Sequence, residues 1–181
     1  ITLERALTVS CNTAFAELGM EVGAAALLDA VEAAGFNAAI PFEFTTASSA
    51  LPFESIADDL PALAQTALGQ RDVRATPLQM ALVAAAVANE GEIMRPYLVQ
   101  AIRDADGEET ARFRAAAWRR AMSEETAAAL AEMMEQVVLN GTGWRAAVPG
   151  VRIAGKTGTA EIPGGAPDVW FIGFGPVEAE P

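Results

Sequence analysis

Apolar residues recur with a helical period late in the chain, between residues 124 and 140. Ser123 precedes this stretch, and its first two residues are Glu124 and Glu125. A serine cap followed by acidic residues is typical of a helix start, because the acidic charges complement the helix dipole. Asn140-Gly141 is typical of a helix end. The pattern therefore predicts an amphipathic helix whose apolar face carries Leu130, Met134, Val137 and Val138.

Three further helices are predicted over residues 12–20, 23–34 and 77–89. The second is rich in alanine and ends at Gly35, a residue that favours a helix end. The third has two start signals. Thr76 and Gln79 form a capping box, and Pro77 occupies the first helical position.

Two pairs of β-prone segments are also present. Residues 97–104 and 108–115 flank Asp106-Gly107, which favours a hairpin. Residues 151–160 and 169–175 lie on either side of Pro163-Gly164-Gly165 and predict a second antiparallel pair. Residues 36–61 contain three prolines and predict a long connection with little regular structure. We therefore expect an α+β fold in which helices outweigh a small antiparallel sheet.

Composition narrows the chemistry that such a domain can carry out. The chain of 181 residues is long enough for one domain, and its net charge of −12 disfavours nucleic acid as a partner. It contains no histidine and a single cysteine, so the usual zinc sites, an internal disulfide and every Ser-His-Asp arrangement are excluded. We expect no metal and no cofactor. Any base for nucleophilic chemistry must be lysine, a carboxylate or tyrosine.

Lys156 is the only lysine in the chain, against eleven arginines. Residues 150–157 match the P-loop pattern G-x-x-x-x-G-K-[ST], which would indicate a nucleotide-binding site. A P-loop needs a flexible loop followed by a helix that starts at the lysine. Here the loop positions are Val-Arg-Ile-Ala, which favour a strand, and glycines follow. We therefore interpret the match as accidental and place Lys156 on a strand.

A strand with the sequence Lys156-Thr157-Gly158-Thr159 can form the edge of a binding site. Glycine lets a ligand approach the backbone, the two hydroxyls can bind a carboxylate, and a strand N–H can face a developing oxyanion. The alternative interpretation is an exposed strand with a glycine bulge. For Ser10 and Asn12, near the other end of the chain, the alternative is helix capping.

Taken together, Ser10-Cys11-Asn12 and Lys156-Thr157-Gly158-Thr159 resemble the S-x-N and K-T-G motifs of penicillin-binding transpeptidases and serine β-lactamases. The resemblance extends along most of the chain and is strongest to class B penicillin-binding proteins. Other segments that match in the family's order are Ala6-Leu7, Gly69-Gln70, residues 76–81, Ala88-Asn89, residues 140–143, residues 154–161 and residues 170–174.

This resemblance implies a β-lactamase/transpeptidase-like fold and acyl transfer from a D-Ala-D-Ala stem peptide of peptidoglycan, with β-lactams acylating the same serine. It implies that Ser10 relays a proton, that Asn12 holds the acyl amide, and that Lys156 polarises Ser10 and faces the substrate carboxylate. Thr157 and Thr159 would contact that carboxylate, and Gly158 would let the peptide approach the strand. The full-length protein would be extracytoplasmic and anchored in the membrane, with the anchor outside these residues.

The family's nucleophile lies in an S-x-x-K motif that this chain does not contain. We therefore expect residues 1–181 to be the C-terminal part of a transpeptidase domain, inactive alone, with the missing segment or another copy of the chain as a partner. An exposed sheet edge should favour such pairing. Two other functions stay open: a serine β-lactamase, and a non-catalytic penicillin-binding-like module that senses or scaffolds.

Overall fold

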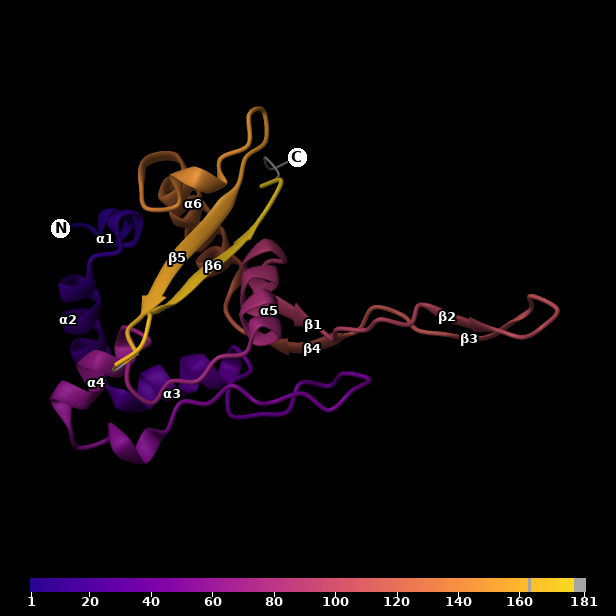
Figure 1. Cartoon of the computed structure of the whole chain (residues 1–181), viewed down its shortest axis with the longest axis horizontal. Coiled ribbons are helices and arrows are strands. Elements are labelled where there is room, and N and C mark those ends of the chain that lie inside the picture. Colours follow the sequence, from indigo (N-terminus) through magenta and orange to yellow (C-terminus); the bar gives the residue numbers. More distant parts are fainter. Residues whose placement is uncertain (163, 178–181) are drawn as a thin grey trace.

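A computed structural model describes residues 1–162 and 164–177, and the chain forms helices packed around short antiparallel strand pairs (Figure 1). The elements, in chain order, are α1 (Leu3–Val9), α2 (Asn12–Val22), α3 (Ala24–Ala33), the 3-10 helix η1 (Phe53–Ser55), α4 (Leu60–Ala67), α5 (Pro77–Ala88), β1 (Glu92–Met94), β2 (Ala101–Arg103), β3 (Glu109–Arg112), β4 (Ala117–Arg120), α6 (Glu124–Asn140), the 3-10 helix η2 (Trp144–Ala146), β5 (Ala154–Ala160) and β6 (Asp168–Phe174).

Two of the predicted helix starts have side-chain caps, but the capping box at Thr76 is only half formed, because the Gln79 side chain donates to the Ala34 carbonyl and the Thr76 N–H donates to Ser49 Oγ. The Ser123 side chain accepts a hydrogen bond from the Thr126 N–H at the start of α6. Thr76 accepts one from the Gln79 N–H at the start of α5, where Pro77 is the first helical residue. Each cap satisfies a backbone donor that has no partner within its helix, so the sequence fixes where these two helices begin.

Helix α4 was not predicted, because Pro61 lies at the end of a segment read as irregular. The proline is instead tolerated in the first turn, where its missing N–H costs nothing. Asp59 caps the helix by accepting from the Ala62 N–H. The preceding segment is mainly irregular, as expected, apart from η1 and a single bridge between Ala50 and Arg74.

The strands form three two-stranded antiparallel ladders among the described residues, rather than one small sheet: β1 with β4, β2 with β3, and β5 with β6. The hairpin expected around Asp106-Gly107 is present but shorter, because only β2 and β3 pair there. Residues 92–94 and 117–120 add a second ladder at its base, with bulges that interrupt the register. Such short segments carry too little alternation to be recognised from sequence.

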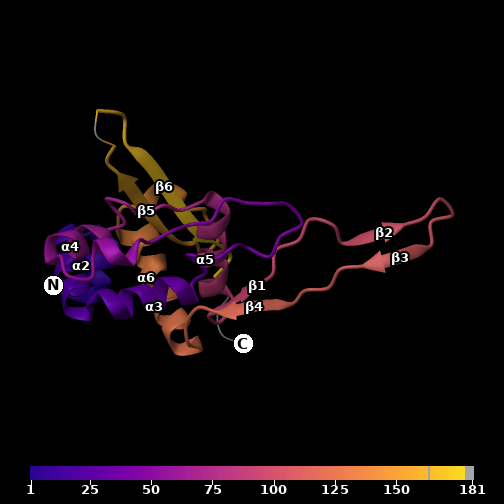
Figure 2. The ribbon, with the colours of Figure 1, turned by 90° about the horizontal axis from the view of Figure 1, so that it is seen from below.

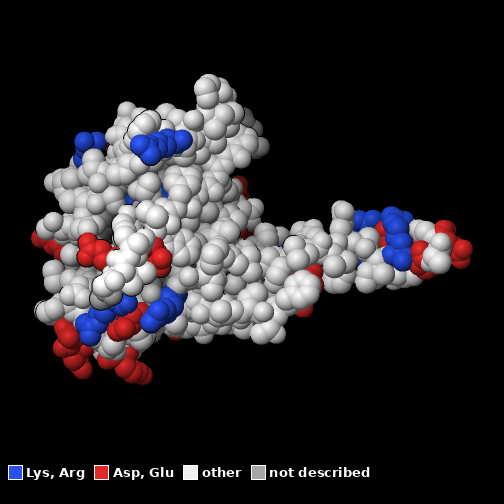
Figure 3. All heavy atoms as spheres, viewed as in Figure 1, with Lys and Arg blue, Asp and Glu red and all other residues white. Residues whose placement is uncertain are grey.

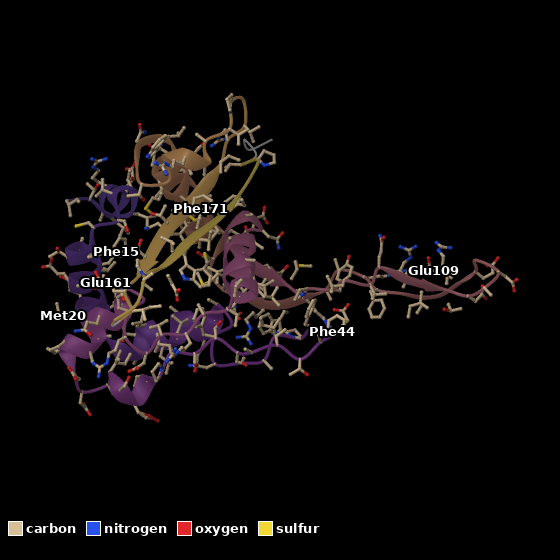
Figure 4. The ribbon with its side chains drawn as sticks, viewed as in Figure 1. Phe15, Met20, Phe44, Glu109, Glu161 and Phe171 are labelled. Carbon is tan, nitrogen blue, oxygen red and sulfur yellow. The ribbon has the colours of Figure 1, made fainter. Side chains whose placement is uncertain are left out.

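The β2–β3 ladder lies on a long arm that projects from the body in both ribbon views, and the β1–β4 ladder lies at the base of this arm against α5 (Figures 1 and 2). Charged groups of both signs gather near its far end (Figure 3), where Glu109 pairs with Arg103 and Arg112. Figure 4 shows Phe44 beside the base of the arm, and its side chain is exposed. The carboxylate of Glu43, the residue before Phe44, accepts a hydrogen bond from the Leu98 N–H and so connects these residues to the arm.

One core cluster lies between α5, α6 and the β5–β6 pair. Val87, Met134 and Ala154 are buried there, with Leu130 and Ile172 packed against them. The predicted apolar face of α6 therefore packs on the strand pair that carries Lys156. A second cluster lies under α3 and α4, and a third joins α5 to β1.

Strands β5 and β6 pair over seven residues each, with Lys156 opposite Ile172 and Thr159 opposite Val169. This confirms the strand interpretation, because Lys156 lies within β5 and no helix begins there in the part of the chain that the structure describes. Pro163, in the predicted loop between the strands, lies outside the described residues. No helix within residues 1–162 or 164–177 is long and apolar enough to cross a membrane.

Candidate active site

Ser10 lies between α1 and α2 in a left-handed backbone conformation, with φ 55° and ψ 53°. Its N–H donates to the Leu7 carbonyl and the following N–H donates to Ala6, so the turn is held by backbone bonds. A left-handed conformation is uncommon for a residue other than glycine and costs about 1–3 kcal/mol, a strain often found at functional sites. The Ser10 side chain is not used to cap a helix, contrary to the alternative interpretation.

Lys156 reaches Ser10 across 146 positions of sequence. Its ammonium donates to Ser10 Oγ at 2.8 Å and to the Thr157 carbonyl at 2.7 Å. The lysine is half-buried, and this burial lowers the pKa of its ammonium from the ordinary value of 10.5. A lysine with a lowered pKa beside a hydroxyl is suited to proton exchange with that hydroxyl.

A cleft of about 460 Å³ opens between the start of α2, the end of α6 and β5. Its lining residues are Ser10, Asn12, Thr142, Thr157, Gly158, Thr159, Val169 and Trp170. The five other predicted site residues thus line one cleft, and Lys156 adjoins it through Ser10. Asn12 is the first residue of α2 and is exposed to solvent. No lining residue among those described is acidic, so the cleft suits an anionic ligand such as a carboxylate.

Thr142 is a site residue to which the sequence patterns assigned no role, because Asn140-Gly141 reads as a helix end. Its hydroxyl lies 2.6 Å from the Thr157 hydroxyl, and its N–H donates to the Thr8 carbonyl at 3.2 Å. Gly141 lies against Thr8 so closely that a Cβ there would overlap the Thr8 backbone. This close approach of α1 brings the Thr142 hydroxyl to the cleft.

Gln70 is a second residue to which the patterns assigned no role. Its side-chain amide donates to the Thr159 carbonyl at 3.0 Å, from the turn that follows α4. No local signal in the sequence relates the two positions, which are 89 residues apart. Groups of three or more potential metal ligands of the His, Cys, Asp or Glu type are absent from the described residues.

Known proteins match this chain along nearly its whole length. The model of the penicillin binding protein transpeptidase domain matches residues 1–180. The peptidoglycan D,D-transpeptidase PbpA of Mycolicibacterium smegmatis is 39% identical over 188 residues, which cover 98% of this chain and 36% of that protein.

Two solved structures are similarly close. The D,D-transpeptidase domain of a peptidoglycan glycosyltransferase from Eggerthella lenta superposes with a TM-score of 0.90 at 39% identity, covering 98% of this chain and 46% of that one. The imipenem acyl-enzyme complex of penicillin-binding protein A from M. tuberculosis gives a TM-score of 0.90 at 39% identity, covering 98% of this chain and 40% of that one. The chain thus spans less than half of the relatives it matches. Because the family model and these relatives align along nearly all of its length, the chain belongs to the penicillin-binding protein transpeptidase family.

Proposed function

We propose that residues 1–181 are the C-terminal part of the transpeptidase domain of a peptidoglycan D,D-transpeptidase. The observation that carries this proposal is the 2.8 Å contact between Lys156 Nζ and Ser10 Oγ, which joins two motifs far apart in sequence beside one cleft. The family relationship supports it. The full-length protein is extracytoplasmic and anchored in the membrane by a segment outside these residues.

In the proposed reaction, a serine hydroxyl adds to the carbonyl of the penultimate D-Ala of a stem peptide. The peptide C–N bond breaks, and the proton of the serine passes to the nitrogen of the leaving D-Ala. An amine of a neighbouring strand then attacks the acyl ester, the ester C–O bond breaks, and a proton from the amine returns to the serine oxygen as the new peptide bond forms. This nucleophile belongs to an S-x-x-K segment that is not among the 181 residues. β-Lactams react at the same serine, where the lactam C–N bond breaks in place of the peptide bond.

The residues of this chain move the proton and bind the substrate. Ser10 relays the proton to the leaving nitrogen, and the Lys156 ammonium keeps the Ser10 hydroxyl polarised. Asn12 holds the acyl amide of the substrate. Thr157 and Thr159 donate hydroxyl hydrogen bonds to its carboxylate, near the positive charge of Lys156. Gly158 lets the peptide approach β5, and the Thr159 N–H supplies half of the oxyanion hole.

Labelling with a fluorescent penicillin tests the proposal in the full-length protein that contains this chain. Lys156→Ala should lower the second-order rate constant of acylation by about 10²-fold or more, as expected for the loss of a group that acts in proton transfer. Arg114→Ala removes one positive charge from an exposed arm residue and should leave the rate unchanged. The isolated 181-residue chain should form no labelled adduct.

Three outcomes would contradict the proposal in different ways. A full-length protein that is never labelled would indicate a non-catalytic penicillin-binding-like module. Rapid release of the label with turnover of the β-lactam would indicate a serine β-lactamase. Equal rates for Lys156→Ala and Arg114→Ala would remove Lys156 from the proposed mechanism.

A further inference from the structure

One edge of β5 faces the cleft, and two contacts identify the backbone groups along it. The Thr157 carbonyl accepts from Lys156 Nζ and the Thr159 carbonyl accepts from Gln70 Nε2, so both carbonyls point away from the partner strand β6. Within a strand, the N–H and the C=O of one residue point to the same side. The N–H groups of Thr157 and Thr159 therefore also face the cleft.

This edge is the surface to which an extended peptide would add as another strand. Such pairing uses both the N–H and the C=O of an edge residue. At Thr159, the C=O already accepts a side-chain amide from the protein itself. An amide N–H of glutamine is chemically equivalent to a peptide N–H as a donor, so Gln70 occupies the place of a substrate backbone donor.

The turn after α4 fixes the backbone of Gln70. The Gly69 N–H donates to Thr66 and the Gln70 N–H donates to Gln65, which together form a Schellman motif at the end of α4. Gly69 has φ 74°, the left-handed conformation that the motif requires. The helix itself packs against α2, the element that begins at Asn12. The Gln70 side chain has rotatable bonds beyond this fixed backbone, so its amide can leave Thr159 while the turn stays in place.

We infer that Gln70 is a specificity-determining residue, an internal competitor that occupies the Thr159 carbonyl until an acyl donor with a suitably placed amide N–H displaces it. This inference rests on the proposed function. Ligands that offer such an N–H exchange one hydrogen bond for another. Ligands without it leave the Gln70 contact intact and gain nothing from this carbonyl.

Two β-lactams with the same nucleus test the inference in the full-length protein. Benzylpenicillin carries an acylamino N–H beside the lactam ring, and penicillanic acid lacks that side chain. Gln70→Ala should raise the second-order acylation rate constant of benzylpenicillin about 2- to 10-fold, since a net hydrogen bond contributes about 0.5–1.5 kcal/mol. The rate constant of penicillanic acid should change by less than about twofold.

Gln70→Met is the second variant, because it keeps the side-chain length and removes the donor. It should give the same result, and it decides the question if Gln70→Ala does not fold. Gln100→Ala, at an exposed position on the arm, is the matched control and should change neither rate constant.

A lower rate constant for benzylpenicillin, or equal changes for both ligands, would overturn the inference and make Gln70 a support for the end of β5. Failure of the unsubstituted full-length protein to react with benzylpenicillin would be a different result. It would overturn the proposed function itself, and the inference with it.

Discussion

At the scale of single residues, Lys156 combines partial burial with two hydrogen bonds that its ammonium donates, to Ser10 Oγ and to the Thr157 carbonyl. Burial disfavours the charged form, while these acceptors favour it. Desolvation is the larger effect, and the pKa of Lys156 is therefore lowered. Between this lowered value and 10.5, the unfolded chain binds more protons than the folded chain. The free energy of unfolding should consequently rise with pH through that window.

Because Lys156 is the only lysine, its titration can be followed directly in the 181-residue chain. Labelling with ε-¹³C-lysine should give one resonance whose midpoint lies below 10.5 in the folded protein. In a concentrated denaturant the midpoint should return to about 10.4, the value for an unperturbed lysine. Identical midpoints in the two states would show that burial does not affect this ammonium.

Sequence patterns alone predicted part of the candidate site. Lys156 was noticed as the only lysine, within a glycine-containing motif, and the strand-favouring residues before it placed it correctly on β5. The partner Ser10 lies 146 positions away, so only the family resemblance linked the two. Gly69-Gln70 belongs to the family resemblance, but the contact of Gln70 with Thr159 could not be predicted, since it depends on how α4 packs and not on any local pattern.

At the scale of elements, caps determine where the longest helix begins. Replacing Ser123 by alanine removes the acceptor of the Thr126 N–H and should lower the free energy of unfolding by about 1 kcal/mol. Ser123→Asp should retain most of the stability, because aspartate also caps helices and favours the positive end of the helix dipole. Urea denaturation of the three proteins gives this comparison. Equal midpoints for serine and alanine would mean that packing alone holds the start of α6.

The elements that the sequence predicted are those with a chemical signal at their ends. Thr76 and Ser123 act as caps in the structure, and Asp106-Gly107 lies in the turn that joins β2 to β3. Strands β1 and β4 were missed, because three or four residues are too few for a periodic pattern and no turn signal joins them as Asp106-Gly107 joins β2 and β3. Their pairing depends on contacts between segments more than twenty residues apart, which no window of sequence contains.

At the scale of the whole molecule, β6 pairs with β5 along one edge and with no other strand among the described residues. A groove of about 570 Å³ runs between β6 and α5. Val169 is 80% exposed on β6, and Phe171, labelled in Figure 4, is 47% exposed. A strand with one unpaired edge and exposed apolar side chains is a template for pairing with another chain.

The 181-residue chain should therefore self-associate at high concentration. Light scattering should give a mass that rises with concentration, and Val169→Lys should reduce this rise because a charge opposes edge pairing. Val148→Lys replaces another exposed valine outside this strand and serves as the control. A constant monomer mass for the unsubstituted chain at all concentrations would contradict the prediction.

The arm of β2 and β3 adds length to the molecule without adding a core of its own, since its strand residues are almost all exposed. Isolated two-stranded ribbons have marginal stability in water. Opening of the ribbon should therefore be far more frequent than opening of α6 or β5. In deuterium oxide, the amides of the ribbon should exchange early by local fraying. Those of the central core should exchange only through global unfolding.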